Sequence, residues 1–291
     1  MNTLRVAWVA MMISGVLLMG GCGSQTDAIS RPDIDGNQVA NGGIFRTAIR
    51  AGDGDSQWIF MFGEEQDAGA DNRIVAYRLG DNADEFISGR FVTSLDSGVR
   101  RANVLWVDTV EVIPDEDTPE DELPEEPEFE RRVRPAVLDV LIQDEEHLLG
   151  TLSGEGIDAT VDGDYQDAWY ERPAGHGIVA GEWRDLDAFG RENISIAINS
   201  EGGFGGRTID DCTLSGQFTA INARFNLYEV IIANLCDETL DATGLASVRP
   251  ASSSTTPGSV STLVMVVPLR DGSDILGFQL AAESEPDGFQ R

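Results

Sequence analysis

Three cysteines and two histidines are the side chains of this 291-residue sequence best suited to metal, redox or nucleophilic chemistry. The cysteines are Cys22, Cys212 and Cys236, and no pair of them has the Cys-x-x-Cys spacing of a zinc or redox motif. The histidines, His147 and His176, are far apart in the sequence, and we expect each to be a solvated loop residue. The spacing therefore predicts neither a metal centre nor a redox site.

The sequence also lacks the motifs that usually organise a catalytic site. Ser153 and Ser215 each have only one flanking glycine, so neither is the serine of a G-x-S-x-G nucleophile elbow. The glycine-rich segment 201–206 has no third glycine in dinucleotide register and no long helix after it, which favours a hairpin turn. Acidic residues are so abundant that two at the spacing of a glycosidase pair arise by chance. We therefore predict that the protein is not an enzyme and needs no cofactor, with a carboxylate-based glycosidase as a remote alternative.

Two other kinds of binding site are weakly indicated. The segments 33–37 and 53–55 are similar to acidic calcium loops, but neither has the glycine and glutamate positions of an EF-hand. We expect diffuse cation binding by the acidic surface rather than a specific calcium site. Four tryptophans could stack on a ligand, but an aromatic residue in an alternating strand is usually part of the core; these are Trp58, Trp106, Trp169 and Trp183.

The N-terminal segment has the layout of a signal peptide. Arg5 precedes an apolar run from Val6 to Met19, which is followed by two glycines and Cys22. A run of about fourteen apolar residues is too short to cross a bilayer, which needs about 20 residues, but has the length of a signal-peptide core. An N-terminal buried helix is the alternative. We predict a signal peptide over 1–21.

The residues 18–22, Leu-Met-Gly-Gly-Cys, resemble the lipobox of bacterial lipoproteins, with Met19 where leucine is commonest. This resemblance implies cleavage before Cys22 and acylation of its thiol and amine, which would hold the chain on a lipid bilayer without a transmembrane helix. Gly23 stands where lipoproteins retained in the inner membrane carry aspartate. The resemblance therefore implies an outer-membrane lipoprotein, on its periplasmic face or at the cell surface.

In an exported chain, the two remaining thiols predict a disulfide between Cys212 and Cys236. Closing that loop would stabilise the fold by about 3.5 kcal/mol in the chain-entropy model. Two unrelated buried thiols are the competing interpretation.

The charge balance excludes whole classes of partner. The sequence has 51 acidic and 20 basic residues, a formal net charge of -31, and every basic residue is arginine. Such a chain lacks the positive charge that binding to nucleic acid or to an anionic membrane surface needs. The acidity is typical of proteins from salt-adapted organisms, in which ambient salt screens the self-repulsion; a genome bias toward arginine is the alternative.

Sixteen short β-type runs separated by glycine-, aspartate- and asparagine-rich turns predict an all-β antiparallel fold, a barrel or a sandwich. In the run 212–220, Leu214, Gly216, Phe218 and Ala220 share one face and polar residues share the other, as in a half-buried strand. We expect a flexible tether over 22–42, a β-rich unit over 43–170 and an eight-stranded barrel over 171–291. The first half either forms its own unit or shares one larger sheet. An extended acidic loop is expected over 115–130, which holds ten acids and three prolines.

Several motifs together resemble a set of uncharacterised proteobacterial lipoproteins: V-D-G-D-Y at 161–165, G-E-W at 181–183 and D-D-C-T-L-S-G at 210–216. The resemblance implies a β-rich first half and a small disulfide-bearing barrel, and it carries over no catalytic or binding residue. We therefore expect a lipid-anchored, non-enzymatic binding or envelope-structural module with an unknown protein or small-molecule partner. A barrel similar to lysozyme inhibitors, or one that carries a small ligand in the periplasm, is the alternative.

Overall fold

The structure is a computed structural model that describes ten stretches of the chain. The predicted signal peptide, Cys22, most of the acidic loop and the predicted tether up to residue 41 lie outside the described residues. From Ile34 onward the chain forms one compact unit. The described stretches are 42–52, 54–63, 72–80, 85–94, 97–112, 129–144, 146–186, 192–236, 238–251 and 260–283.

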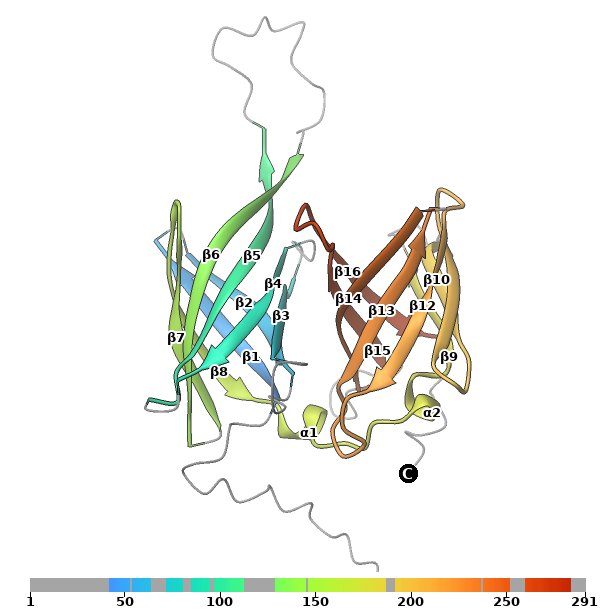
Figure 1. The fold of residues 1–291 in the computed structure, drawn as a ribbon, viewed down its shortest axis with the longest axis horizontal. Coiled ribbons are helices and arrows are strands. Elements are labelled where there is room, and N and C mark those ends of the chain that lie inside the picture. The colour runs from blue at the N-terminus through green and yellow to red at the C-terminus, as the bar shows by residue number, and fades with distance from the viewer. Residues whose placement is uncertain are drawn as a thin grey trace, which may run out of the picture. The chain divides into compact units, whose positions relative to one another are not determined.

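The first eight strands close into an antiparallel barrel in which each strand pairs with the next, and the last pairs with the first (Figure 1). A closed barrel leaves no strand edge unpaired. The strands are β1 (Gly43–Ala51), β2 (Gly54–Phe62), β3 (Arg73–Arg78), β4 (Phe86–Thr93), β5 (Arg100–Glu111), β6 (Phe129–Gln143), β7 (His147–Gly154) and β8 (Ile157–Tyr165).

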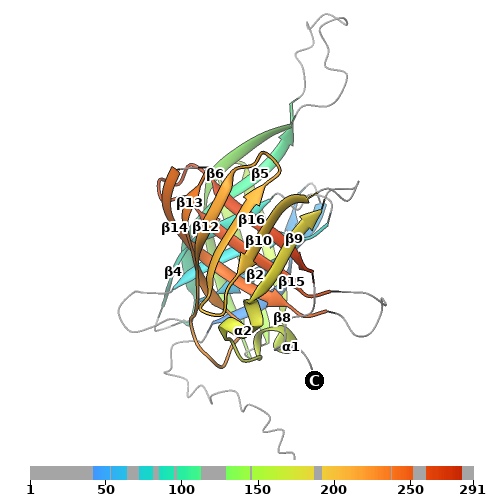
Figure 2. The ribbon, with the colours of Figure 1, turned by 90° about the vertical axis from the view of Figure 1, so that its right-hand side faces the viewer.

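The second eight strands form another closed barrel, in which the last strand, β16, pairs with the first, β9 (Figure 2). Two one-turn helices, α1 (Asp167–Tyr170) and α2 (His176–Val179), lie in the chain between the barrels. The strands are β9 (Gly181–Leu186), β10 (Glu192–Ile198), β11 (Gly203–Thr208), β12 (Thr213–Ala220), β13 (Tyr228–Leu235), β14 (Glu238–Arg249), β15 (Thr262–Pro268) and β16 (Ile275–Ala282).

The all-β prediction is confirmed, and each of the sixteen predicted runs overlaps a strand. The first half forms a barrel of its own rather than sharing a sheet with the second. Two details of the prediction were wrong. Strand β6 begins at Phe129, so the last two residues of the predicted acidic loop pair in the ladder with β5. The ninth run of the sequence, Val179–Leu186, predicts a strand from Val179, but Val179 ends helix α2 and the strand β9 starts at Gly181.

Alternating side chains fill the interior of both barrels. In β12, Leu214 and Phe218 are buried, as the alternation predicted, and they join a core cluster that runs through the second barrel. In β8, Ile157, Ala159 and Val161 alternate with exposed residues and join the core cluster of the first barrel. Burial on one face only is what the period of two along an antiparallel strand produces.

Strands β3 and β15 are buried on both faces. Their sequences, Ile74–Tyr77 and Leu263–Val267, are continuous apolar runs without the alternation of the other strands. A third apolar cluster explains this, because it joins residues on the outer faces of both barrels, among them Val75, Tyr77, Val264 and Val266. The two barrels therefore share an apolar contact in addition to their separate cores.

The chain between the barrels is anchored to the second barrel by buried polar contacts. Trp169 of α1 donates through Nε1 to Ser247 Oγ at 2.9 Å, and Asn226 donates through Nδ2 to the Trp169 backbone oxygen at 3.1 Å. Tyr170 stacks on Phe225 with ring centroids 4.7 Å apart. Because buried hydrogen-bonding groups need partners, this pairing fixes α1 in place. Within the described ranges, no helix is both long and apolar enough to cross a bilayer.

Candidate functional site

A cavity of about 820 Å³ opens at one end of the first barrel. This is the end where β1 meets β2 and β7 meets β8, and where β5 finishes and β6 starts. We call this cavity the cup. Its lining includes aliphatic residues and a group of polar, charged and aromatic residues, which comprises Asp55, Ser56, Arg78, Glu85, Trp106, Asp108, Thr109, Arg132, Arg134 and Asp158.

The charged residues of the cup continue the inward-facing rows of the barrel strands. In β5, Trp106 and Asp108 are in phase with Ala102 and Val104, which belong to the core. In β6, Arg134 is two residues before the core residue Ala136. Because every second side chain of a strand points to the same face, the alternation that buries the core directs these polar side chains into the mouth of the barrel.

The other end of the first barrel is filled. Phe62 and Phe91 are fully buried there, and the guanidinium carbon of Arg100 lies 5.2 Å and 4.9 Å from their ring centroids. Arg100 itself is 1% exposed, and its charge interacts with the faces of both rings. The cup is therefore the open end of a barrel whose other end is packed with aromatic side chains.

Asp108 is the acceptor at the centre of one wall of the cup. Arg134 donates through Nη2 to Asp108 Oδ2 at 2.6 Å, and Arg132 Nη2 lies 3.6 Å from the same oxygen. Asp108 is only 8% exposed, so its charge needs these partners. Both guanidinium groups approach Oδ2 of Asp108, and the other carboxylate oxygen, Oδ1, makes no hydrogen bond to a described residue.

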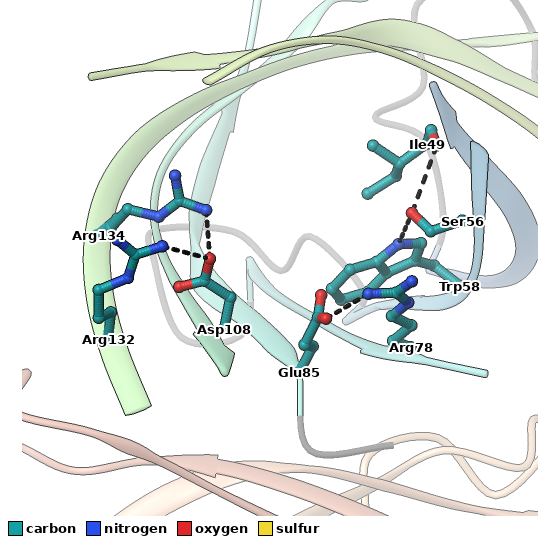
Figure 3. Close-up of polar contacts among 8 residues, drawn as sticks. All are labelled: Ile49, Ser56, Trp58, Arg78, Glu85, Asp108, Arg132 and Arg134. Carbon is teal, nitrogen blue, oxygen red and sulfur yellow. Dashed lines mark hydrogen bonds and ion pairs between the residues drawn. The ribbon is translucent and has the colours of Figure 1, made fainter. Parts of the chain in front are cut away.

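A second ion pair lies beside the first on the neighbouring strands, between Arg78 at the end of β3 and Glu85 just before β4. Glu85 is 5% exposed. Burial raises the pKa of the Glu85 carboxyl above its usual value, and the Arg78 charge only partly opposes this effect. Figure 3 shows Asp108 and Glu85, the two carboxylates, beside each other. The residues drawn are Ile49, Ser56, Trp58, Arg78, Glu85, Asp108, Arg132 and Arg134.

Two tryptophans meet at the floor of the cup. Trp58 is completely buried, and its ring is perpendicular to that of Trp106, with centroids 5.9 Å apart. Trp58 donates through Nε1 to Ser56 Oγ at 2.8 Å, and Ser56 Oγ donates in turn to the Ile49 backbone oxygen at 3.4 Å. The guanidinium carbon of Arg134 lies 5.1 Å from the Trp106 ring centroid. These contacts fix the orientation of the Trp106 ring.

Three buried polar atoms at this wall have no hydrogen-bond partner among the described residues: Trp106 Nε1, Asp108 Oδ1 and Arg134 Nε. A buried donor or acceptor without a partner costs free energy. Each of these atoms has less than 1 Å² of accessible surface, so they lie behind the surface of the cup and not on it. The strongest indication of a functional site in the described part of the chain is therefore the cavity itself, with the two ion pairs in its lining.

The second barrel lacks an equivalent polar mouth in the residues described here. Its core cluster consists of apolar and aromatic side chains, and Trp183, completely buried, donates through Nε1 to the Val179 backbone oxygen at 2.7 Å. The hollow of about 570 Å³ beside β10 to β13 is lined mainly by small and apolar residues such as Ala197, Gly205 and Ile231.

Of the residues selected from the sequence, Trp106 and two residues of the acidic segment 53–55, Gly54 and Asp55, line the cup. Cys212 and Cys236 form a disulfide in the second barrel, as predicted, and Cys22 lies outside the described residues. The histidines are not loop residues: His147 begins β7, with Nδ1 2.9 Å from Asp164 Oδ1, and His176 begins α2. Of the four tryptophans, Trp106 lines the cup, and the other three belong to buried clusters, as Trp58, Trp169 and Trp183.

Metal binding finds no support among the described residues, which contain no group of three or more metal-ligating side chains. The acidic segment 33–37 lies outside the described residues, and so does Asp53 of the second acidic segment.

Sequence analysis missed the charged residues of the cup, although a signal for them existed. Arg132, Arg134 and Asp108 stand at positions of their strands that are in phase with apolar core residues. A charge at a core position of an alternating strand is unusual enough to mark a site. Comparison of the chain with protein-family models, with curated proteins and with solved structures finds no match.

Proposed function

We propose that this protein is a non-enzymatic binding module that takes a small ligand in the cup of its first barrel. The observation that carries the proposal is the cavity of about 820 Å³ at the open end of the barrel, whose lining includes the Asp108–Arg134 and Arg78–Glu85 ion pairs. Of the two alternatives that the sequence left open for a periplasmic barrel, this supports the small-ligand carrier rather than the lysozyme inhibitor.

The dimensions and rigidity of the cup support this proposal. Its volume of about 820 Å³ falls within the range of ligand pockets, roughly 300–1,000 Å³. The polar side chains of its wall are held by ion pairs and ring contacts in the absence of a ligand, as the Asp108–Arg134 pair illustrates. A site that is already ordered loses less conformational entropy when a ligand binds.

We further propose that the module is attached to the outer membrane through acylated Cys22. The motivation is the short apolar run that ends at a cysteine, together with Gly23 after it. The bilayer is then the partner that localises the protein, and the cup is the part that binds the ligand.

The binding proposal is tested with the purified full chain carrying Cys22→Ser, screened by thermal shift against a chemically diverse metabolite library and followed by calorimetry. The cup is blocked with Ala51→Trp, because Ala51 lines the cup at the end of β1. The matched control is Gln57→Trp, at an exposed position of the neighbouring strand. We expect ligands that stabilise the parent and Gln57→Trp but not Ala51→Trp. If no library member binds, or if Ala51→Trp binds as well as the parent, the proposal is wrong.

A glycoside hydrolase is the second candidate, because two carboxylates, Glu85 and Asp108, line one cavity and the pKa of Glu85 is raised. The binding role is favoured over it because guanidinium groups already engage both carboxylates. Incubation with a panel of nitrophenyl glycosides separates the two roles. Turnover that Glu85→Gln abolishes would support the hydrolase and contradict the non-enzymatic role.

A further inference from the structure

We infer that the ligand of the cup is a small organic oxyanion, a carboxylate or a phosphate ester, whose charged group binds Arg132 beside Arg134 and Arg78. This inference rests on the proposed function, because it names the class of ligand that the same cavity takes.

The phase of the strands separates the charged residues that face the interior of the cup from those that only border it. In β2, Asp55 is in phase with Ile59, which belongs to the apolar cluster on the outer faces of the barrels, and its ion pair is with Arg50 at 3.5 Å. In β8, Asp158 is exposed and comes just before the core residue Ala159. Because every second side chain of a strand points to the same face, the carboxylates of Asp55 and Asp158 point out of the barrel.

The charged residues that point inward have a surplus of one positive charge. Arg78 comes two residues after the core residue Ala76, and Glu85 comes two residues before the core residue Ile87. Glu130, the next residue of β6 in the inward phase, is outside the lining. The inward-pointing charges of the lining are therefore three arginines and two carboxylates, namely Arg78, Arg132, Arg134, Glu85 and Asp108.

The arginines, rather than the carboxylates, form the charged surface that the cup presents. The side chains of Arg78, Arg132 and Arg134 are 28%, 46% and 27% exposed. Those of Glu85 and Asp108 are only 7% and 11% exposed. A molecule in the cup therefore meets guanidinium groups, with the two carboxylates largely covered behind them.

Arg132 is the arginine whose charge is least neutralised. Its Nη2 lies 3.6 Å from Asp108 Oδ2, which is longer than a hydrogen bond, whereas Arg134 donates to the same oxygen at 2.6 Å. Figure 3 shows both guanidinium groups directed at Asp108. A guanidinium has five N–H donors, and no hydrogen bond joins Arg132 to another described residue. Its donors are therefore available to a carboxylate or phosphate group, which a guanidinium can bind through two parallel hydrogen bonds.

The charge of this surface determines the sign of the ligand. A cation beside Arg132 and Arg134 would be repelled, and an uncharged ligand that covered Arg132 would remove water from its charge without replacing it by an opposite one. An anion both pairs with Arg132 and compensates the surplus charge.

The rest of the lining indicates an organic ligand rather than an inorganic ion. A cavity of about 820 Å³ is far larger than a phosphate ion needs. Ala51, Trp106 and Val110 also line the cup and are partly exposed, so they offer apolar surface to the body of a ligand.

The test compares oxyanions with neutral and cationic probes by calorimetry, using the full chain carrying Cys22→Ser. The oxyanions are succinate, benzoate, glucose 6-phosphate and inorganic phosphate; the neutral analogues are succinamide, benzamide and glucose; the cation is 1,4-diaminobutane. The buffer contains 0.15 M NaCl, at which the Debye length is about 8 Å, so that the charges on the outer faces are largely screened. We expect saturable binding of at least one organic oxyanion, with at least tenfold weaker binding of its neutral analogue, of the cation and of inorganic phosphate. Which of the oxyanions bind distinguishes a carboxylate from a phosphate ester.

Two variants of opposite effect locate the binding at the arginines. Arg132→Gln should weaken binding about tenfold or more, roughly what hydrogen bonds to a charged group provide. Glu85→Gln removes a negative charge behind Arg78 and should strengthen binding. The matched control is Arg101→Gln, which removes an arginine from the outer face of β5, where its side chain is 71% exposed, and should leave the affinity unchanged. Thermal melts show whether each variant is folded.

The possible results separate this inference from the proposed function. If no organic oxyanion binds, if inorganic phosphate or a neutral analogue binds as tightly, or if Arg132→Gln binds as tightly as the parent, the oxyanion assignment is wrong. Weaker binding by Glu85→Gln would also contradict it. In each case, a ligand from the metabolite library whose binding Ala51→Trp abolishes keeps the cup as a site for another class of molecule. If the library also yields no ligand, the proposed function fails as well.

Discussion

Trp106 and Arg134 are direct cross-strand partners on β5 and β6, and the Arg134 guanidinium carbon lies 5.1 Å from the centroid of the Trp106 ring. The same guanidinium holds Asp108, two residues further along β5. One strand register therefore brings an aromatic ring, a cation and an anion together at the mouth of the barrel. The predictions below begin with this group.

Asp108→Asn should destabilise the protein by about 1–3 kcal/mol, because Arg134 and Arg132 would lose the carboxylate that neutralises them in a partly buried site. The matched control is Asp139→Asn. Asp139 bonds Arg101 on the outer face of the same two strands, where Arg101 is largely exposed, and such pairs contribute only about 0–1 kcal/mol. Urea unfolding measures both variants. Equal losses would contradict the structural role assigned to the Asp108 pair.

Glu85 should make stability depend on pH with a sign opposite to that of an ordinary surface acid. Because burial raises the pKa of Glu85, the folded state binds a proton there more tightly than the unfolded state. Its contribution to stability is complete below the usual glutamate pKa, about 4.3, and is lost as the pH rises through the raised pKa. The free energy of unfolding of the parent minus that of Glu85→Gln should therefore fall over this interval.

Asp271 provides the control of opposite sign. Hydrogen bonds from the Ser273 hydroxyl and backbone N–H lower the pKa of the Asp271 carboxyl. Its contribution is present above the usual aspartate pKa and is lost as the pH falls through the lowered value. The free energy of unfolding of the parent minus that of Asp271→Asn should therefore rise with pH. Urea unfolding at a series of acid pH values measures both differences. If the two differences change with pH in the same direction, the pH dependence assigned to Glu85 is wrong.

Gly206→Ala should destabilise the second barrel by about 1–3 kcal/mol, because a methyl group there would overlap the Ser195 backbone oxygen and the Ile196 side chain. Its neighbour on the same strand is the control. A methyl group on Gly205 meets open space, so Gly205→Ala should change the unfolding free energy by less than about 0.5 kcal/mol. Thermal denaturation of the two variants distinguishes crowding at Gly206 from a general effect of alanine in β11.

Cys212→Ala should lower stability under oxidising conditions by about 3.5 kcal/mol, because the disulfide to Cys236 closes a long loop of the unfolded chain. A reductant should destabilise the parent to a similar extent and leave the variant unchanged. Urea unfolding with and without dithiothreitol makes the comparison. A variant that the reductant still weakens would show that the effect does not come from this disulfide.

If Cys22 carries the proposed lipid anchor, Cys22→Ser should release the protein from the membranes of the cell that produces it and abolish the incorporation of labelled fatty acid. The physical reason is that acyl chains on Cys22 would supply the apolar surface that holds the chain to a bilayer. Membrane fractionation and mass spectrometry of the mature N-terminus provide the measurement. An intact, unacylated N-terminus on membrane-bound protein would refute the anchor.

Most of the fold was predictable because it depends on local patterns. Alternation in segments such as 157–161 indicates a strand with one buried face, and turn residues separate the runs, so all sixteen strands could be recognised. The disulfide was predicted by counting the cysteines of a chain that its N-terminal segment led us to expect to be exported. The number of barrels was not predictable, because closure depends on which strand pairs with β1 or β9, and these pairings join residues distant in sequence.

The cup was less predictable than the fold, for a reason of geometry. Arg78, Glu85, Asp108 and Arg134 come from four consecutive strands or their ends, and the registers of three ladders bring them together. In a sequence with 51 acidic residues, two carboxylates carry no signal of their own. The sequence alone shows that Asp108 and Arg134 alternate in step with apolar core residues. Which charged residues line one cavity could be seen only in the structure.

The aromatic packing around Arg100 closes the first barrel at the end opposite the cup. With Phe62 and Phe91 completely buried at that end, a molecule that entered the cup would have to leave through the same opening. Such a barrel is suited to holding and releasing a molecule and is unsuited to conducting one from end to end.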